Sequence, residues 1–418
     1  MREYLLTLIL TAAVTYLLTP LVRRVAVATG AMHVGRERDV HTEPVPKLGG
    51  LAMYGGLAAG LLIASRISPL RTIFSGSRMA AGLLIAGGLL VIVGFVDDRW
   101  GLNWVAKLAG QVAAAGVLVW SGAQVSWLPV PGGGTLILTQ DQATALTILV
   151  VVATINAVNF IDGLDGLAAG VVGIAATAFF VYYYTLARVV GLPEQAGPAL
   201  AGAVLAGACL GFVPHNFYPA RIFMGDTGSM LLGLLLAYAP ISSIASLDYA
   251  SLTEYRFATV NRFPEILPLI PPLAILIIPY ADLLLAVVRR TRAGLSPFAP
   301  DRKHLHHRLL DIGHSHRLSV LIMYLWTMLF SGTVVWLSVA ETPVWILAGV
   351  TLIAMLALLL MSMPRFRFWN RARPPARAGG RAPARAAQPA SPPPAAASLP
   401  PAAAGSVAGE PRPAPRAG

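Results

Sequence analysis

The sequence predicts an all-α polytopic membrane protein with about eleven transmembrane helices, an active site on the cytoplasmic face and a disordered C-terminal tail. The 418 residues are 56% hydrophobic and only 12% charged, which is too apolar for a soluble domain of this length. The apolar residues fall into windows of membrane-spanning length. The last stretch, residues 371–418, is rich in Pro, Ala, Gly and Arg and cannot bury enough surface to fold.

Each predicted helix is a window of about 18 to 22 mainly apolar residues. The windows lie near residues 4–22, 48–65, 79–96, 103–121, 144–161, 167–187, 199–215, 227–246, 265–288, 318–339 and 344–363. The first has no small-residue cleavage site behind it and favours an uncleaved signal anchor. We therefore expect a transmembrane domain over residues 1–370, followed by the tail.

Basic loops predict the orientation. Five Lys and Arg lie between residues 23 and 47, and seven lie between residues 289 and 317. Because short cytoplasmic loops are enriched in these residues, both loops are expected inside, with the N terminus outside and the C terminus inside. Arg66, Arg71 and Arg78 oppose this orientation but are fewer. The loops and tail account for the net charge of +12, so we expect no nucleic-acid partner.

Acidic and imidazole side chains follow the odd-numbered windows. Asp97 and Asp98 close the third window, Asp162 and Asp165 follow the fifth, and Asp226 follows the seventh. A histidine-rich loop follows the ninth. All of these groups are therefore expected on the cytoplasmic face, where they describe one site and not a proton pathway through the bilayer.

The strongest single motif is residues 156–167, NAVNFIDGLDGL, at the end of an apolar run. Its carboxylates and amides would each cost several kcal/mol in an apolar environment unless they were paired, coordinated or hydrated. Asp162 and Asp165 are three residues apart and can point at a shared centre. The alternative is a glycine turn with solvated acids.

Two other motifs fit the same site. The adjacent Asp97 and Asp98 could hold a divalent metal or leave one acid as a base, although such a pair can also simply hydrate a helix end. In residues 216–229, NFYPARIFMGDTGS, Pro219 favours an extended loop and two glycines let backbone amides approach a ligand. A structured loop between helices is the alternative for that segment.

Basic residues complement the acids. The loop 296–309 carries Arg302, Lys303, His304, His306, His307 and Arg308, which suits phosphate, with a zinc site as the alternative. Lys47 and Lys107 could also contact phosphate, although interfacial snorkelling explains such lysines too. His314 and His316 are expected to be ordinary surface residues.

Five Asp carboxylates cannot bind an anionic substrate without compensation. Mg²⁺ prefers oxygen ligands from carboxylates, water and phosphate. Together with Lys, Arg and His, such an ion provides what phosphoryl transfer requires, namely positioning and charge stabilisation. Because the site opens at the membrane surface, one reactant is expected to be a lipid.

The motifs resemble the polyprenyl-phosphate N-acetylhexosamine-1-phosphate transferases, glycosyltransferase family 4, and within them the WecA/TagO-type undecaprenyl-phosphate GlcNAc-1-phosphate transferases. The resemblance extends to about residue 320. It rests on Pro46-Lys-Leu-Gly-Gly, the Asp97-Asp98 pair, the motifs at 156–166 and 219–229, and His304-Leu-His-His. The related phospho-MurNAc-pentapeptide transferases have three consecutive histidines, whereas Leu305 interrupts the run here. Their activity is kept as an alternative.

The resemblance implies that undecaprenyl phosphate attacks the β-phosphorus of a UDP-N-acetylhexosamine, most simply UDP-GlcNAc, and releases UMP. It implies a multi-pass protein of the bacterial cytoplasmic membrane that starts a lipid-linked envelope glycan such as lipopolysaccharide or teichoic acid. Its partners are then the nucleotide sugar, the polyprenyl phosphate and membrane lipid. Because family relatives are often dimers, a homodimer is also allowed.

The same resemblance assigns roles by motif position. The metal, Mg²⁺ with Mn²⁺ as an alternative, is held by Asp226 with Asn159 and Asp162 beside it. The uridine site is lined by Asp165, Lys47 and Phe223, the last by stacking on uracil. Asp97 is a candidate base or lipid-phosphate positioner, and Asp98 supports it. The phosphates are held by His304, His306, His307, Arg302 and Lys107.

Two alternatives come from other classes of protein. A secondary transporter would use intramembrane carboxylates to bind coupling ions, but such residues usually lie near the midplane on broken helices, often with repeat symmetry. The acids here close helices at one face, and no repeat is obvious in the sequence. A non-enzymatic scaffold that interacts through its tail would leave the acid clusters unexplained.

Overall fold

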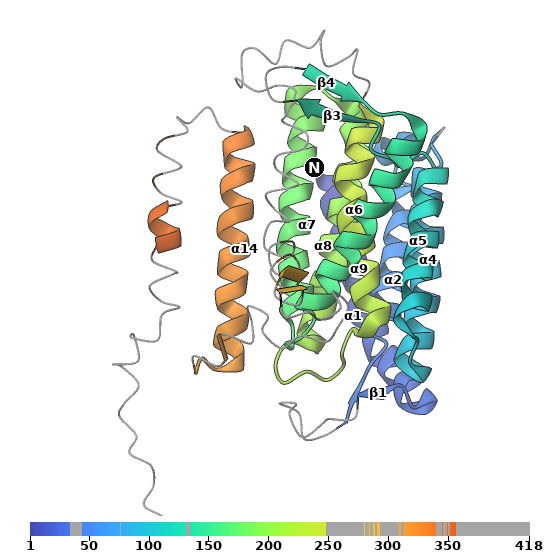
Figure 1. Cartoon of the computed structure of the whole chain (residues 1–418), viewed down its shortest axis with the longest axis vertical. Helices are drawn as coiled ribbons and strands as arrows, with labels where there is room; N and C mark the ends of the chain where they lie inside the picture. The colour runs from blue at the N-terminus through green and yellow to red at the C-terminus, as the bar shows by residue number, and fades with distance from the viewer. Residues whose placement is uncertain are drawn as a thin grey trace, which may run out of the picture. The chain divides into compact units, whose positions relative to one another are not determined.

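The computed structural model describes residues 1–33, 44–75, 77–130, 134–247 and 313–339, with scattered positions at 280–310 and 345–356. These residues form helices and two short strand pairs (Figure 1). In chain order the elements are α1 (Arg2–Thr29), β1 (Met32–His33), β2 (Val45–Pro46), α2 (Gly49–Ala64), α3 (Ser68–Phe74), α4 (Met79–Trp100), α5 (Trp104–Trp120), β3 (Trp127–Val130), β4 (Gly134–Ile137), α6 (Gln140–Ile161), α7 (Leu167–Thr185), η1 (Leu186–Val190), η2 (Pro193–Gln195), α8 (Ala196–Asn216), α9 (Gly225–Ser246) and α14 (His316–Val339).

The predicted class, an all-α polytopic membrane protein, is confirmed. Among the described residues, six helices are long and apolar enough to cross a membrane, or seven if α2 and α3 form one span bent by 109°. The first eight predicted windows and the tenth each coincide with a helix. The ninth and eleventh windows lie largely outside the described residues, so eleven spans are not confirmed.

The first helix shows how the chain suits a bilayer. The buried face of α1 consists largely of threonines at every fourth position, Thr7, Thr11, Thr15 and Thr19. Its exposed face carries large apolar side chains such as Ile9 and Leu17. Small residues let neighbouring helix backbones approach, while apolar side chains that would be unfavourable in water are solvated by lipid. This inverted distribution therefore supports a membrane-spanning α1.

The bundle is centred on α8 and α9. α9 is buried along almost its whole length and packs against α4 and α6, while α8 packs between α1 and α7 (Figure 1). Large aromatic side chains, including Phe179, Tyr183 and Phe212, fill the core around α7 and α8. Because the start of α9 is enclosed on several sides, any polar group there must find its partners within the protein.

The two strand pairs were not predicted. β1 pairs with β2 and β3 pairs with β4, both antiparallel. Strands of two and four residues are too short to show a clear alternation of apolar and polar residues, so no sequence pattern indicated them. β1 and the β3–β4 pair lie at opposite ends of the helix bundle (Figure 1).

The chain divides into two units, Met1–Arg367 and Phe368–Gly418. The second unit contains none of the described residues. The predicted boundary at residue 370 and the predicted disorder of the tail therefore lie outside the described residues.

Candidate active site

The site forms where the end of α4 crosses the start of α9. A Cβ atom added to Gly94 would lie 2.4 Å from the Thr227 Cα, and one added to Gly50 would lie 2.3 Å from the Gly228 nitrogen. Only glycine lets backbones approach this closely without displacement. The crossing brings the two acids at the end of α4 against the first turn of α9.

Asp98 caps the N-terminus of α9. Its Oδ1 accepts a hydrogen bond from the Asp226 N–H at 3.1 Å, and its Oδ2 accepts from the Thr227 N–H at 3.0 Å and from the Thr227 hydroxyl at 2.7 Å. A carboxylate is favourable here because the first N–H groups of a helix have no partner within the helix. Lys47 Nζ lies 3.9 Å from the same carboxylate. Asp98 therefore locks α4 to α9.

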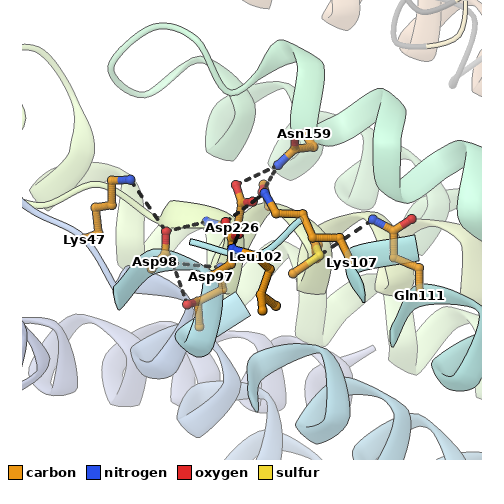
Figure 2. A network of polar contacts seen from close by, with 11 residues as sticks. Lys47, Asp97, Asp98, Leu102, Lys107, Gln111, Asn159 and Asp226 are labelled. Atoms are coloured by element: carbon orange, nitrogen blue, oxygen red, sulfur yellow. Dashed lines mark hydrogen bonds and ion pairs between the residues drawn. The ribbon is translucent and has the colours of Figure 1, made fainter. Parts of the chain in front are cut away.

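Asp97 and Asp226 are joined by a lysine. The Lys107 ammonium lies 2.8 Å from Asp97 Oδ2 and also contacts Asp226 Oδ2 (Figure 2). Asp97 Oδ1 in turn accepts a hydrogen bond of 2.7 Å from the Leu102 N–H. Lys107 thus bridges two carboxylates from helices far apart in sequence, which offsets their mutual repulsion.

Asn159 completes this network from α6. Its Nδ2 donates to Asp226 Oδ1 at 3.0 Å and to the Ser229 hydroxyl at 2.8 Å (Figure 2). One turn earlier, Asn156 donates to Gln111 Oε1 at 2.7 Å, a contact that supports the packing of α6 on α5. Because both Asn159 bonds use the amide nitrogen, its carbonyl oxygen can serve as a ligand.

Phe223 and Lys47 are held side by side by the backbone. The Phe223 N–H donates to the Pro46 carbonyl at 2.8 Å, and the Gly49 N–H donates to the Phe223 carbonyl at 3.0 Å. Leu48, between them, has a φ of +82°, which is unfavourable for a non-glycine residue and is tolerated only where neighbouring contacts impose it. Phe223 is partly exposed.

The two acids of the 156–167 motif differ in environment. Asp165 is only 5% exposed, and its Oδ2 accepts from the Ala220 N–H at 2.9 Å. Among the described residues, no side chain forms a hydrogen bond or ion pair with the Asp162 carboxylate. Burial, reinforced by the nearby carboxylates of Asp226 and Asp98, raises the pKa of Asp162 to about 8. Asp162 therefore lacks the compensation that Asp165 has.

The donor set suits a divalent cation. Asp97, Asp98 and Asp226 can each place a carboxylate oxygen within 4.8 Å of the others, and the Asn159 amide is hydrogen-bonded to Asp226. Oxygen donors of this kind are what Mg²⁺ prefers. Asp97 and Asp98 both accept hydrogen bonds from backbone N–H groups, whereas the described contacts of the Asp226 carboxylate are to side chains, so Asp226 is the best-placed ligand of the three. The carboxylates outnumber the lysines around them, so a cation would lower the repulsion.

The structure brings most of the predicted site residues together. Six of them form one network: Lys47, Asp97, Asp98, Lys107, Asn159 and Asp226 (Figure 2). Asp162 interacts electrostatically with this network, and Asp165 and Phe223 adjoin it through the α8–α9 loop. The predicted phosphate-binding residues Arg302, His304, His306 and His307 lie outside the described residues.

Several residues that support the site were not predicted from the sequence. Thr227 and Ser229 hold the acids and Asn159, and Gln111 supports Asn156. The Thr-Gly-Ser run after Asp226 could have indicated the first two, because hydroxyls next to a helix N-terminus are common hydrogen-bonding groups. His316, expected at the surface, instead contacts the Asp165 backbone and the Tyr218 ring. Only the tertiary structure shows this contact.

Fold and site define a multi-pass membrane protein with a clustered acidic site. Comparisons with known proteins identify its family. Residues 80–244 match the family model described as glycosyl transferase family 4. The decaprenyl-phosphate N-acetylglucosaminephosphotransferase of Mycolicibacterium smegmatis is 42% identical over 333 residues, which cover 78% of this chain and 80% of that protein. The probable undecaprenyl-phosphate N-acetylglucosaminyl 1-phosphate transferase of Bacillus subtilis is 32% identical, with 77% and 83% covered.

A more distant relative follows the same pattern. The undecaprenyl-phosphate alpha-N-acetylglucosaminyl 1-phosphate transferase of Escherichia coli O157:H7 is 26% identical, with 84% of this chain and 88% of the relative covered. The chain belongs to the polyprenyl-phosphate N-acetylhexosamine-1-phosphate transferase family, glycosyl transferase family 4.

Proposed function

We propose that this protein transfers GlcNAc-1-phosphate from UDP-GlcNAc to a polyprenyl phosphate. An oxygen of the lipid phosphate bonds to the β-phosphorus of UDP-GlcNAc, the bond from that phosphorus to the bridging oxygen breaks, and UMP leaves with the electron pair. The observation that carries the proposal is the cluster of Asp97, Asp98 and Asp226. The names of the relatives favour GlcNAc over the phospho-MurNAc-pentapeptide alternative.

The roles follow from the contacts. Asp226, Asn159 and Asp162 would hold Mg²⁺, or Mn²⁺ in its place, which when bound supplies charge neutralisation at the diphosphate. Lys107 is fixed between two carboxylates, so its charge is positioned before the substrate arrives. Phe223 would stack on the uracil base, with Lys47 beside it. His304, His306, His307 and Arg302 would complete the phosphate contacts.

Asp97 is better suited to positioning than to proton transfer. A phosphate monoester has a second pKa of about 6 and is largely a dianion at pH 7, so the attacking oxygen already lacks its proton. Asp97 is also ion-paired with Lys107 and accepts a hydrogen bond from the Leu102 N–H. We therefore assign it to holding Lys107 in place.

The site is expected to face the cytoplasm of a bacterial inner membrane. The Lys and Arg of the 23–47 loop favour that orientation, and a site at the membrane surface is accessible both to a water-soluble nucleotide sugar and to a lipid phosphate. The length of the polyprenyl chain is open to test, because relatives named for decaprenyl and for undecaprenyl phosphate are both similar.

The test is a transfer assay with purified protein in detergent. UDP-GlcNAc, UDP-GalNAc and UDP-MurNAc-pentapeptide are each offered with decaprenyl or undecaprenyl phosphate, and UMP and lipid product are quantified. We expect UMP and lipid-linked GlcNAc diphosphate in equal amounts, only when divalent metal is present. Metal-independent transfer would contradict the metal assignment. The transporter alternative would instead be supported if the protein released no UMP in this assay and, after reconstitution into vesicles, catalysed ion-coupled uptake.

A further inference from the structure

The turn that carries Asp162 and Asp165 is held in place by α14. The Asp165 N–H donates a hydrogen bond of 3.0 Å to His316 Nε2, in the first turn of α14. An imidazole nitrogen can accept a hydrogen bond only when it carries no proton. His316 must therefore be neutral in this arrangement, with its proton on Nδ1.

The His316 ring is itself fixed by an aromatic neighbour. It stacks on the Tyr218 ring at 4.6 Å between centroids and 26° between planes. Tyr218 belongs to the loop between α8 and α9, the same loop that supplies Phe223 and leads to Asp226. His316 thus contacts both segments that approach the acidic cluster.

Gly166, the next residue of the turn, is also fixed by hydrogen bonds. The Gly166 N–H donates to Asn216 Oδ1 at 3.1 Å, and its carbonyl accepts from the Tyr324 hydroxyl, also on α14. The Tyr324 ring packs so closely on α7 that a Cβ added to Gly170 would lie 1.9 Å from it. The Asp165–Gly166 backbone is therefore bonded from two sides, by α14 and by the end of α8.

Asp162 gains most from this support. In contrast to Asp97 and Asp226, its carboxylate has no hydrogen-bond or ion-pair partner among the described side chains, so its position depends on the backbone of the turn. A displacement of about 1 Å in a group that contacts reactants can cost about 100-fold in rate. Whatever fixes the turn therefore affects how Asp162 meets a metal and diphosphate.

We propose that His316 is a positioning residue for this site: its Nε2 holds the Asp165 N–H, and through it the Asp162 carboxylate, in the geometry that the reaction requires. The proposal rests on the proposed transferase function for its kinetic consequences. It assigns a role to α14, whose N-terminal end follows shortly after the predicted phosphate-binding loop in the sequence.

Two substitutions separate hydrogen bonding from stacking. His316→Phe keeps a ring against Tyr218 but removes the acceptor, whereas His316→Gln places an amide oxygen near the former Nε2 and loses the ring. We expect His316→Phe to lower kcat about 10- to 100-fold and to weaken Mn²⁺ binding, measured by the electron paramagnetic resonance signal of free Mn²⁺. His316→Gln should recover most of both properties.

The matched control is Arg317→Gln. Arg317 is the next residue of α14, is exposed and lies over the Tyr218 ring at 5.6 Å, without a described contact to the turn. Activity and Mn²⁺ binding should stay within about twofold of the unmodified protein. Size-exclusion chromatography and thermal unfolding of all variants show whether each is folded.

The outcomes are distinct. Wild-type kcat and Mn²⁺ binding in His316→Phe, or equal losses in His316→Phe and His316→Gln, would overturn the proposal, since the acceptor would then be irrelevant. A folded His316→Phe variant with weak Mn²⁺ binding that His316→Gln restores would support it. If the unmodified protein transferred no sugar phosphate, the proposed function would fail, while Mn²⁺ binding would still decide the role of His316.

Discussion

The acidic cluster and the neighbouring turn hold their carboxylates in different ways. In the cluster of Asp97, Asp98 and Asp226, Asp98 bonds directly to the first turn of α9, and Asp97 and Asp226 share Lys107. In the turn after α6, Asp165 is used for a structural bond to Ala220, and Asp162 has no comparable bond within the described residues. The cluster is fixed by the crossing of α4 and α9. The turn is fixed by α14, the end of α8 and the α8–α9 loop.

This difference distinguishes the acids that hold the fold together from the acids that could bind a ligand. The charge of Asp98 is used to join α4 to α9, and the charge of Asp165 joins the turn to the α8–α9 loop. Asp226 and Asp162 are more available for a cation, since the described contacts of the Asp226 carboxylate are to side chains and the Asp162 carboxylate is unpaired among the described side chains. Acids in one site therefore need not share one role, and substitution can tell them apart.

The largest effect is expected for Asp226→Asn. The variant keeps the size of the side chain but removes the charge that pairs with Lys107 and that would bind the proposed metal. We expect UMP release to fall about 1,000-fold, because electrostatic stabilisation at the transferring group is lost. The measurement is metal-dependent UMP release by protein with an unchanged size-exclusion profile. Full activity would remove Asp226 from the metal site.

Gly94→Ala should disturb the helix crossing that builds the cluster. The new Cβ would lie 2.4 Å from the Thr227 Cα, so α4 and α9 must separate, at a cost of about 1–3 kcal/mol. We expect a lower unfolding temperature and a loss of activity of about 100-fold. Gly116→Ala is the control, since a Cβ there meets nothing within 4 Å in the described structure. Equal behaviour of the two variants would contradict the role of the crossing.

Much of this comparison was predictable from the sequence. The acids at 97–98, 162–165 and 226 follow odd-numbered windows, and the ends of alternate membrane-spanning helices lie on the same side of the membrane. The order of the windows therefore indicated one shared face. The bend between α2 and α3 was not predicted, because the apolar window 48–65 ends before it and α3 has only 7 residues, too few for a membrane-spanning window. Nor was the division of roles, because Asp162 and Asp165 differ only through partners supplied by Ala220 and α14, which are distant in sequence.

The two acids of the turn provide a direct contrast. Asp162→Asn should raise the Mg²⁺ concentration needed for half-maximal activity at least about tenfold, since one ligand charge is lost. Asp165→Asn keeps an oxygen that can accept from the Ala220 N–H, so we expect a smaller change. Titrating activity with Mg²⁺ compares them. The account would be wrong if Asp165→Asn changed the metal requirement more than Asp162→Asn.

Phe223→Ala tests the nucleotide side of the site. Stacking of an aromatic ring on a base contributes about 1–3 kcal/mol, so we expect KM for UDP-GlcNAc to rise about tenfold. KM for the polyprenyl phosphate is the internal control and should change little. A change confined to the lipid KM would place the uridine site elsewhere.

The smallest effect is expected from removing residues 374–418. This segment is rich in Pro, Ala and Arg, and the proposed site draws no residue from it. Transfer activity should remain within about twofold. A large loss of activity in a stable, membrane-inserted truncation would reveal a function of the tail.

Mn²⁺ binding to the purified protein most directly tests the central claim. The claim is that the carboxylates of α4 and α9, with Asn159 and Asp162 at the end of α6, form a divalent-cation site. Electron paramagnetic resonance of free Mn²⁺ would be recorded during titration of the unmodified protein and of Asp226→Asn. We predict one saturable site in the unmodified protein that Mg²⁺ displaces and that Asp226→Asn loses. Equal binding by both proteins, or active protein that binds no Mn²⁺, would contradict the claim.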